Sequence, residues 1–152
     1  MATSDNIQYL SAANDKVAVS NRRTTETFYA GGDITAGDFV CFDTSQTGAD
    51  RVVYVIEADV GSATTKQAIG VCLDTIDVSA VSDLRVEVVI KGYVEGANVA
   101  NAVSAVGAPL SVGGTAGRAV SFAGADTLAP CAVALEAASG NTADVYVIGL
   151  FS

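Results

Sequence analysis

The chain has 152 residues, half of them hydrophobic, which is enough for one domain with a real core. Its net charge is −9 and its eight basic residues are scattered, which excludes the positive field that nucleic acids and anionic membrane surfaces require. No apolar run approaches the roughly 20 residues that span a bilayer, and the first residues lack the pattern of a signal peptide. We therefore expect neither a nucleic-acid nor a membrane partner, and a protein that is made in a cytoplasm and stays soluble.

The first 30 residues are polar and weakly periodic, which predicts an N-terminal arm or edge segment over 1–30. An arm that becomes ordered on a partner needs apolar anchors and ionic ones. We therefore take Phe28 and Tyr29 as candidate apolar partner contacts, and Arg22 and Arg23 as candidate ionic contacts.

From residue 31 onward, short apolar runs alternate with turns rich in Gly, Ser, Thr and Asp. This pattern predicts a single all-β domain over 31–152, a β-sandwich or β-barrel of about eight or nine short strands, rather than βαβ units. The stretch 95–106, rich in Ala and Asn, is compatible with one short helix. The runs expected to form strands are 39–42, 51–57, 68–73, 84–94, 109–112, 118–122, 131–136 and 144–151.

The second half of the chain repeats the first. The matching segments are 37–42 with 107–112, 51–53 with 118–120, 70–74 with 132–136, and 88–92 with 145–149. Their offsets of 70, 67, 62 and 57 residues fall steadily, as expected if the second copy has shorter loops. We therefore expect half-repeats of about 31–96 and 97–152 that pack into one body with internal pseudo-symmetry.

The residue types that carry most catalysis and metal binding are scarce. The chain has no histidine, which removes the commonest general base and metal ligand. Cys41, Cys72 and Cys131 show no C-x-x-C spacing and lie in apolar runs, so we expect buried thiols rather than a metal site or a disulfide framework. The glycine-rich segment 113–117 precedes a strand-like run without lysine, which predicts a hairpin turn rather than a phosphate loop.

Asp74 and Glu136 occupy matching positions in the two half-repeats and are the nearest approach to a catalytic carboxylate pair. Two such groups about 5–10 Å apart could cleave a glycosidic bond. Both lie where a strand meets a loop, so solvated turn acids are the favoured interpretation, and a His-free hydrolase is the alternative. Asp33 and Asp38 flank a turn and are interpreted in the same way.

Three motifs resemble those of small capsid decoration (cement) proteins of tailed bacterial viruses. They are Gly37-Asp38-Phe39-Val40 entering a strand, Gly70-Val71-Cys72-Leu73 in a core run, and Lys91-Gly92-Tyr93-Val94-Glu95-Gly96 at the end of an alternating strand. The second copy, Ala132-Val133-Ala134-Leu135, lacks the glycine of that core run. The resemblance covers residues 31–152, and its motifs are short and apolar.

The resemblance implies a non-catalytic viral structural protein without a cofactor, which binds the outer surface of a capsid and stabilises it. Its expected partners are the major capsid protein and further copies of itself in a homotrimer, and its expected location is the capsid exterior of the virion. The alternatives are a β-module of a phage tail or head fibre and a carbohydrate-binding module. A carbohydrate-binding module would present exposed aromatic rings, whereas Tyr54, Tyr93 and Tyr146 are expected within strands, in the core or at an interface.

Overall fold

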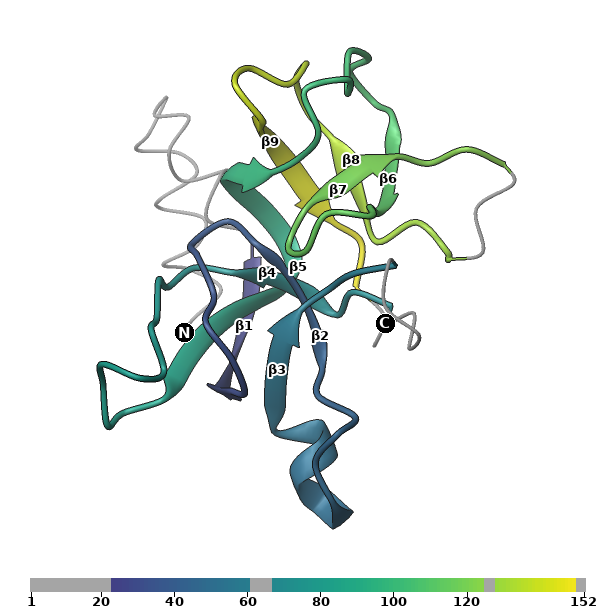
Figure 1. Cartoon of the computed structure of the whole chain (residues 1–152). Coiled ribbons are helices and arrows are strands. Elements are labelled where there is room, and N and C mark those ends of the chain that lie inside the picture. The colour runs from purple at the N-terminus through teal and green to yellow at the C-terminus, as the bar shows by residue number, and fades with distance from the viewer. Residues whose placement is uncertain (1–22, 61–66, 125–127, 150–152) are drawn as a thin grey trace, which may run out of the picture.

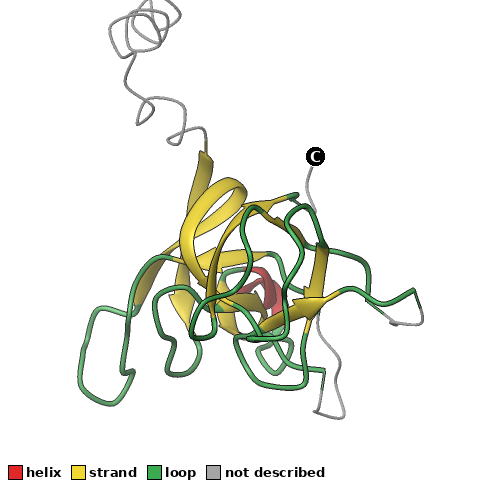
Figure 2. Cartoon of the chain, turned by 90° about the horizontal axis from the view of Figure 1, so that it is seen from above, coloured by secondary structure: helices red, strands yellow, loops and turns green. Residues whose placement is uncertain are grey.

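The computed structural model describes residues 23–60, 67–124 and 128–149, which form one mixed sheet of nine strands (Figure 1). The fold is therefore all-β, as the sequence predicted. One short 3-10 helix, η1 (Gly48–Val52), is the single helical segment of the described residues, and loops surround the strands in the view from above (Figure 2). The strands are β1 (Arg23–Ala30), β2 (Phe39–Phe42), β3 (Tyr54–Glu57), β4 (Gly70–Cys72), β5 (Arg85–Asn98), β6 (Pro109–Val112), β7 (Ala119–Ser121), β8 (Ala132–Ala134) and β9 (Thr142–Val147).

The first five strands close into a ring. β1 pairs in parallel with β3 and antiparallel with β5, while β3, β2, β4 and β5 pair antiparallel in that order. Because the pairing returns to β1, these strands form a small barrel with no open end to the sheet order. We call β1–β4 together with the N-terminal half of β5 the first unit.

The second unit, β6–β9 with the C-terminal half of β5, repeats this pattern of pairing. β5 pairs antiparallel with β9, followed by β8, β6 and β7. A parallel bridge between Val99 and Ala119 links the end of β5 to β7, as Ala30 and Val55 link β1 to β3. The two predicted halves therefore share one topology, and they are joined through one long strand.

The strand register tests the predicted repeat residue by residue. Val40 lies opposite Gly70 and Leu110 lies opposite Ala132, which confirms the offsets of 70 and 62. Val71 opposite Val89 and Val133 opposite Tyr146 confirm the offset of 57 in the same way.

The fourth offset was wrong. Cys41 lies opposite Ile56 and Ser111 lies opposite Val120, so β3 and β7 are 64 residues apart rather than 67. The strand expected from residue 51 begins at Tyr54 instead, because residues 48–52 form η1.

Three further expectations about boundaries differ from the structure. Residues 95–98 continue β5, so no helix forms there, and 99–106 form the bridge and turns. Within the described residues, 23–30 are not a separate arm, because they pair with both β3 and β5 as a strand of the first barrel. The expected boundary between the half-repeats, at 96–97, falls inside β5, which both units share.

The core consists of two clusters that divide along the repeat. One fills the first barrel and contains Phe28, Ala30, Ile34, Val40, Val55, Ile69, Cys72, Ile76, Val86, Val88 and Ile90. The other joins the inward side chains of the second unit to Phe39, Val71 and Val89, which point out of the first barrel.

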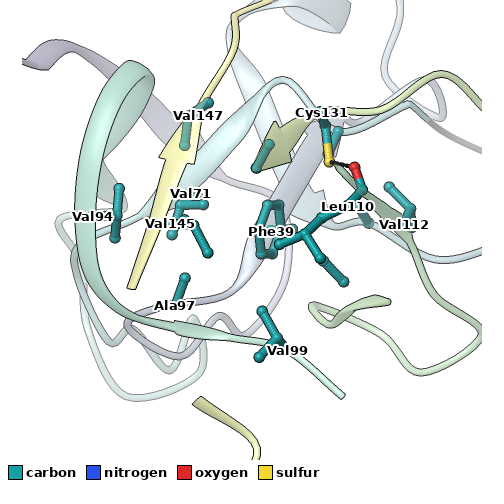
Figure 3. Packing of buried hydrophobic residues seen from close by; sticks show 14 of the residues in the cluster. Phe39, Val71, Val94, Ala97, Val99, Leu110, Val112, Cys131, Val145 and Val147 are labelled. Atoms are coloured by element: carbon teal, nitrogen blue, oxygen red, sulfur yellow. Dashed lines mark hydrogen bonds between the residues drawn. The ribbon is translucent and has the colours of Figure 1, made fainter. Parts of the chain in front are cut away.

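The second unit has smaller inward side chains than the first. Ala97 and Ala143 form the cross-strand pair that corresponds to Phe28 and Val86. Phe39 from the first unit lies among the inward side chains of the second, close to Val99, Leu110 and Val145 (Figure 3). The outer face of the first unit thus completes the core of the second.

Candidate interaction surface

The four partner contacts expected from the sequence have different positions. Arg22 lies outside the described residues. Arg23 is exposed at the start of β1, opposite Gly92. Phe28 is only 6% exposed and packs edge-on against Phe42, with the ring centroids 6.1 Å apart. Phe28 therefore belongs to the core of the first barrel, and the described candidates that can reach a partner are Arg23 and Tyr29.

Tyr29 is the most prominent of these candidates, with 44% of its surface exposed. Its ring lies 5.5 Å from the ring of Tyr54 on β3, and its backbone N–H donates to the carbonyl of Val53 at 2.8 Å. Val52 and Val53 are exposed as well. We call Tyr29, Val52, Val53 and Tyr54 the Tyr29 patch, an exposed apolar surface at the β3–η1 end of the molecule (Figure 1).

Asp74 and Glu136 act on the backbone of their own units. Asp74 Oδ2 accepts the N–H of Glu87 at 2.7 Å, and Glu136 Oε1 accepts the N–H of Asp144 at 3.1 Å. The two acceptors and the two donors are repeat equivalents, so the same hydrogen bond is made once in each unit. Each carboxylate thus holds the strand beside it, which is a structural role of a turn acid.

Asp38 differs from the solvated turn acid that was expected. It is 2% exposed, and its Oδ2 accepts the N–H of Thr35 at 2.8 Å. Its Oδ1 accepts the side-chain amide of Asn98 at 2.8 Å, and Arg118 donates to the Oδ1 of Asn98 at 3.3 Å. Asp38 is buried because the second unit covers it, and it ties the two units together.

Glu57 at the end of β3 hydrogen-bonds to Asp38. Its own partial burial, followed by that hydrogen bond and the nearby charges of Asp38, Asp33 and Asp59, raises the pKa of Glu57 to about 7. Sequence reasoning missed this pair. The available signal was the position of Asp38 directly before the apolar run 39–41 and of Glu57 directly after the apolar run 54–56.

The glycine-rich segment 113–117 forms the predicted hairpin turn between β6 and β7. Gly113 donates its N–H to the carbonyl of Arg118 at 2.8 Å. The turn also contacts the first unit, because Phe39 donates to the carbonyl of Gly117 at 2.8 Å and Gly117 donates to that of Ala58 at 3.0 Å. Its glycines thus allow close approach between the units.

The three cysteines are buried free thiols, as expected. Burial raises the pKa of the Cys72 thiol to about 11 and that of Cys131 to about 12, which disfavours the reactive thiolate. Within the described ranges, no group of three or more Cys, Asp or Glu side chains is placed to hold a metal ion.

Comparison with known proteins leaves the chain without a relative. No protein-family model matches it, and no curated protein is similar to it. Among the residues that the structure describes, no helix has the length and apolar character needed to cross a membrane.

Proposed function

We propose that the protein is a viral structural protein that binds the outer surface of a capsid, stabilises it without catalysis, and assembles as a homotrimer. The observation that carries this proposal is the body of two equivalent β units fused through β5. Its carboxylates that attracted attention as catalytic candidates, Asp74 and Glu136, are engaged in holding backbone. The major capsid protein is the proposed partner, and the capsid exterior the proposed location.

The physical basis of such a function is repeated weak attachment. A body that presents the same surface many times on a lattice binds strongly, because each further contact is made at high effective concentration. The exposed Tyr29 patch and Arg23 provide apolar and ionic groups of the kind that anchor interfaces. The net charge of −9 favours a partner surface rich in basic residues.

Thermal disruption of undecorated heads tests the proposal. Heads are incubated with increasing amounts of the purified chain, and the temperature at which they release DNA is measured by dye fluorescence. We expect this temperature to rise and to level off once the sites are occupied. An unrelated acidic protein of similar size is the control. No protection at saturating protein contradicts capsid stabilisation, and immunogold labelling of tails or fibres instead of heads favours a tail or head-fibre module.

Carbohydrate binding is the second candidate, and the exposed rings of Tyr29 and Tyr54 favour it. Sugars stack on exposed aromatic rings, and this pair lies open at one end of the molecule. A glycan array probed with the native chain and with Tyr29→Ala tests it. Binding that is lost in the variant supports a sugar-binding module, and an array without signal removes it.

A further inference from the structure

The two units differ in what covers their outer faces. In the first unit, Phe39, Val71 and Val89 point out of the barrel and are fully buried, because the second unit packs against them. These three residues lie side by side on β2, β4 and β5. An apolar row on the outside of the repeat is therefore an interface within this chain.

The same row on the second unit is uncovered. The equivalents of Phe39, Val71 and Val89 are Pro109, Val133 and Tyr146, which lie side by side on β6, β8 and β9. Pro109 is exposed, Val133 is half-buried and Tyr146 is 40% exposed. Leu135, the counterpart of the partly buried Leu73, is 42% exposed. We call Pro109, Val133, Leu135 and Tyr146 the β6–β8–β9 face.

The composition of this face is that of an interface rather than of a solvated surface. Four neighbouring outward positions carry apolar side chains, and contiguous exposed apolar patches on soluble proteins mark interaction sites. Tyr146 has the large amphipathic side chain that dominates interface energetics. The repeat supplies the second argument, because the equivalent face of the first unit already binds a β unit of this chain.

Charge indicates which surface fits the face. Glu136 follows Leu135, and Asp144 lies two residues before Tyr146 on the same outward side, where it accepts the hydroxyl of Tyr93 at 2.5 Å. At the other end of the molecule, the Tyr29 patch adjoins Arg51 and Arg85. Arg85 is the cross-strand neighbour of Tyr29, and both arginines are exposed. The ion pair of Arg85 with Asp83 is exposed as well, so it is weak and can be exchanged.

We propose that the β6–β8–β9 face binds the Tyr29 patch of a second copy of this chain. The face and the patch lie at opposite ends of the molecule (Figure 1), so the contact is head-to-tail. A head-to-tail contact that closes gives a ring, and a ring of three chains presents six β units. This inference rests on the self-association in the proposed function and is independent of capsid binding.

Light scattering after gel filtration tests the contact on the isolated full-length chain. We expect the native protein at three times the 15.3 kDa mass of the chain. Tyr146→Glu and Leu135→Glu, separately and together, are expected to shift it to the mass of one chain. Val81→Glu is the matched control, since Val81 is an exposed valine in a loop of the first unit, and it stays assembled. Far-UV circular dichroism checks that each variant is folded, and the less invasive Tyr146→Ser serves if a glutamate variant is not.

Mixing two defective variants tests the head-to-tail geometry. Tyr29→Glu removes the patch and Leu135→Glu with Tyr146→Glu removes the face, so each variant alone is expected as a single chain. Their mixture is expected to give a species of two chains and nothing larger, because one intact face meets one intact patch. A native single chain, an assembly unaffected by the face variants, or a mixture that does not pair would each overturn the proposal.

The two proposals fail separately. If the ring forms as described but heads gain no thermal protection, capsid stabilisation is wrong and the contact stands. If heads are protected while the face variants remain assembled, the contact is wrong and the capsid function stands.

Discussion

Glu57 and Asp38 form a hydrogen-bonded carboxyl pair at the junction of the two β units, and the pKa of Glu57 is raised to about 7. The folded state therefore keeps a proton that the unfolded chain releases near the ordinary value of 4.5. Folding takes up this proton at pH values between those two. The contribution of Glu57 to the free energy of unfolding is thus present below pH 4.5 and is lost as the pH rises to 7.

Replacing Glu57 by glutamine tests this pair. The amide keeps a donor for Asp38 and cannot ionise, so we expect Glu57→Gln to be more stable than the native chain at pH 8 by about 1 kcal/mol, after discounting for solvent screening. At pH 4.5 the two proteins should have similar stability. Urea unfolding at both pH values measures the difference, and Glu26→Gln, an exposed position on β1, is the control. An equal effect at both pH values would contradict a shared proton.

Phe39 is expected to stabilise the second unit from its position in the first. It is fully buried among side chains of both units, so Phe39→Ala leaves a cavity at their junction. We expect a loss of about 3–5 kcal/mol in the free energy of unfolding. Phe122→Ala, at a half-buried position after β7, should cost only about 1 kcal/mol. Equal losses would show that Phe39 does not join the two cores.

Gly70 is the position where the two repeats cannot exchange residues. A Cβ on Gly70 would lie 2.3 Å from the carbonyl oxygen of Val89, whereas the equivalent position in the second unit is Ala132. We therefore expect Gly70→Ala to cost about 1–3 kcal/mol through overpacking. Gly124→Ala, where an added Cβ meets nothing within 4 Å, should change stability by less than about 0.5 kcal/mol. Thermal unfolding of both variants makes the comparison, and a neutral Gly70→Ala would contradict it.

Local pattern predicted most of the β architecture because strands and tight turns are encoded nearby in the chain. The order of the strands and three of the four repeat offsets were confirmed by the register. The fourth failed at 51–53, where turn chemistry prevailed over β propensity. Gly48 adopts a positive φ of 59°, and Arg51 Nε donates to the carbonyl of Gln46 at 2.8 Å, so the chain coils into η1 before β3 begins.

The interaction surfaces depend on contacts between the units, which local pattern does not contain. Asp38 was expected in solvent, but Asn98 from the second unit covers it. Phe28 and Tyr29 were expected to act together, although neighbouring residues in a strand point to opposite faces, which is the signal that could have separated them. The β6–β8–β9 face was not predicted, because its meaning emerges only when Tyr146 is compared with its buried counterpart, Val89.

The cysteines provide a probe of global unfolding. All three thiols are buried, and burial raises the pKa of Cys72 and Cys131 to about 11 and about 12. We expect no reaction with a disulfide reagent at pH 8 in the native protein, and three equivalents on complete unfolding in urea. The urea midpoint of labelling should coincide with that of circular dichroism. A thiol that reacts rapidly without denaturant would mean that the core opens locally around it.

Asp74 and Glu136 allow the independence of the two units to be measured. Each accepts one backbone N–H, so Asp74→Ala and Glu136→Ala should each cost about 0.5–1.5 kcal/mol. Asp74→Asn and Glu136→Gln keep an oxygen acceptor and should cost less. The double alanine variant should show the sum of the single losses, because the carboxylates serve separate strands. A loss that departs strongly from additivity would instead reveal coupling between the carboxylates, and a glycoside-cleaving activity abolished in the double variant would restore the hydrolase alternative.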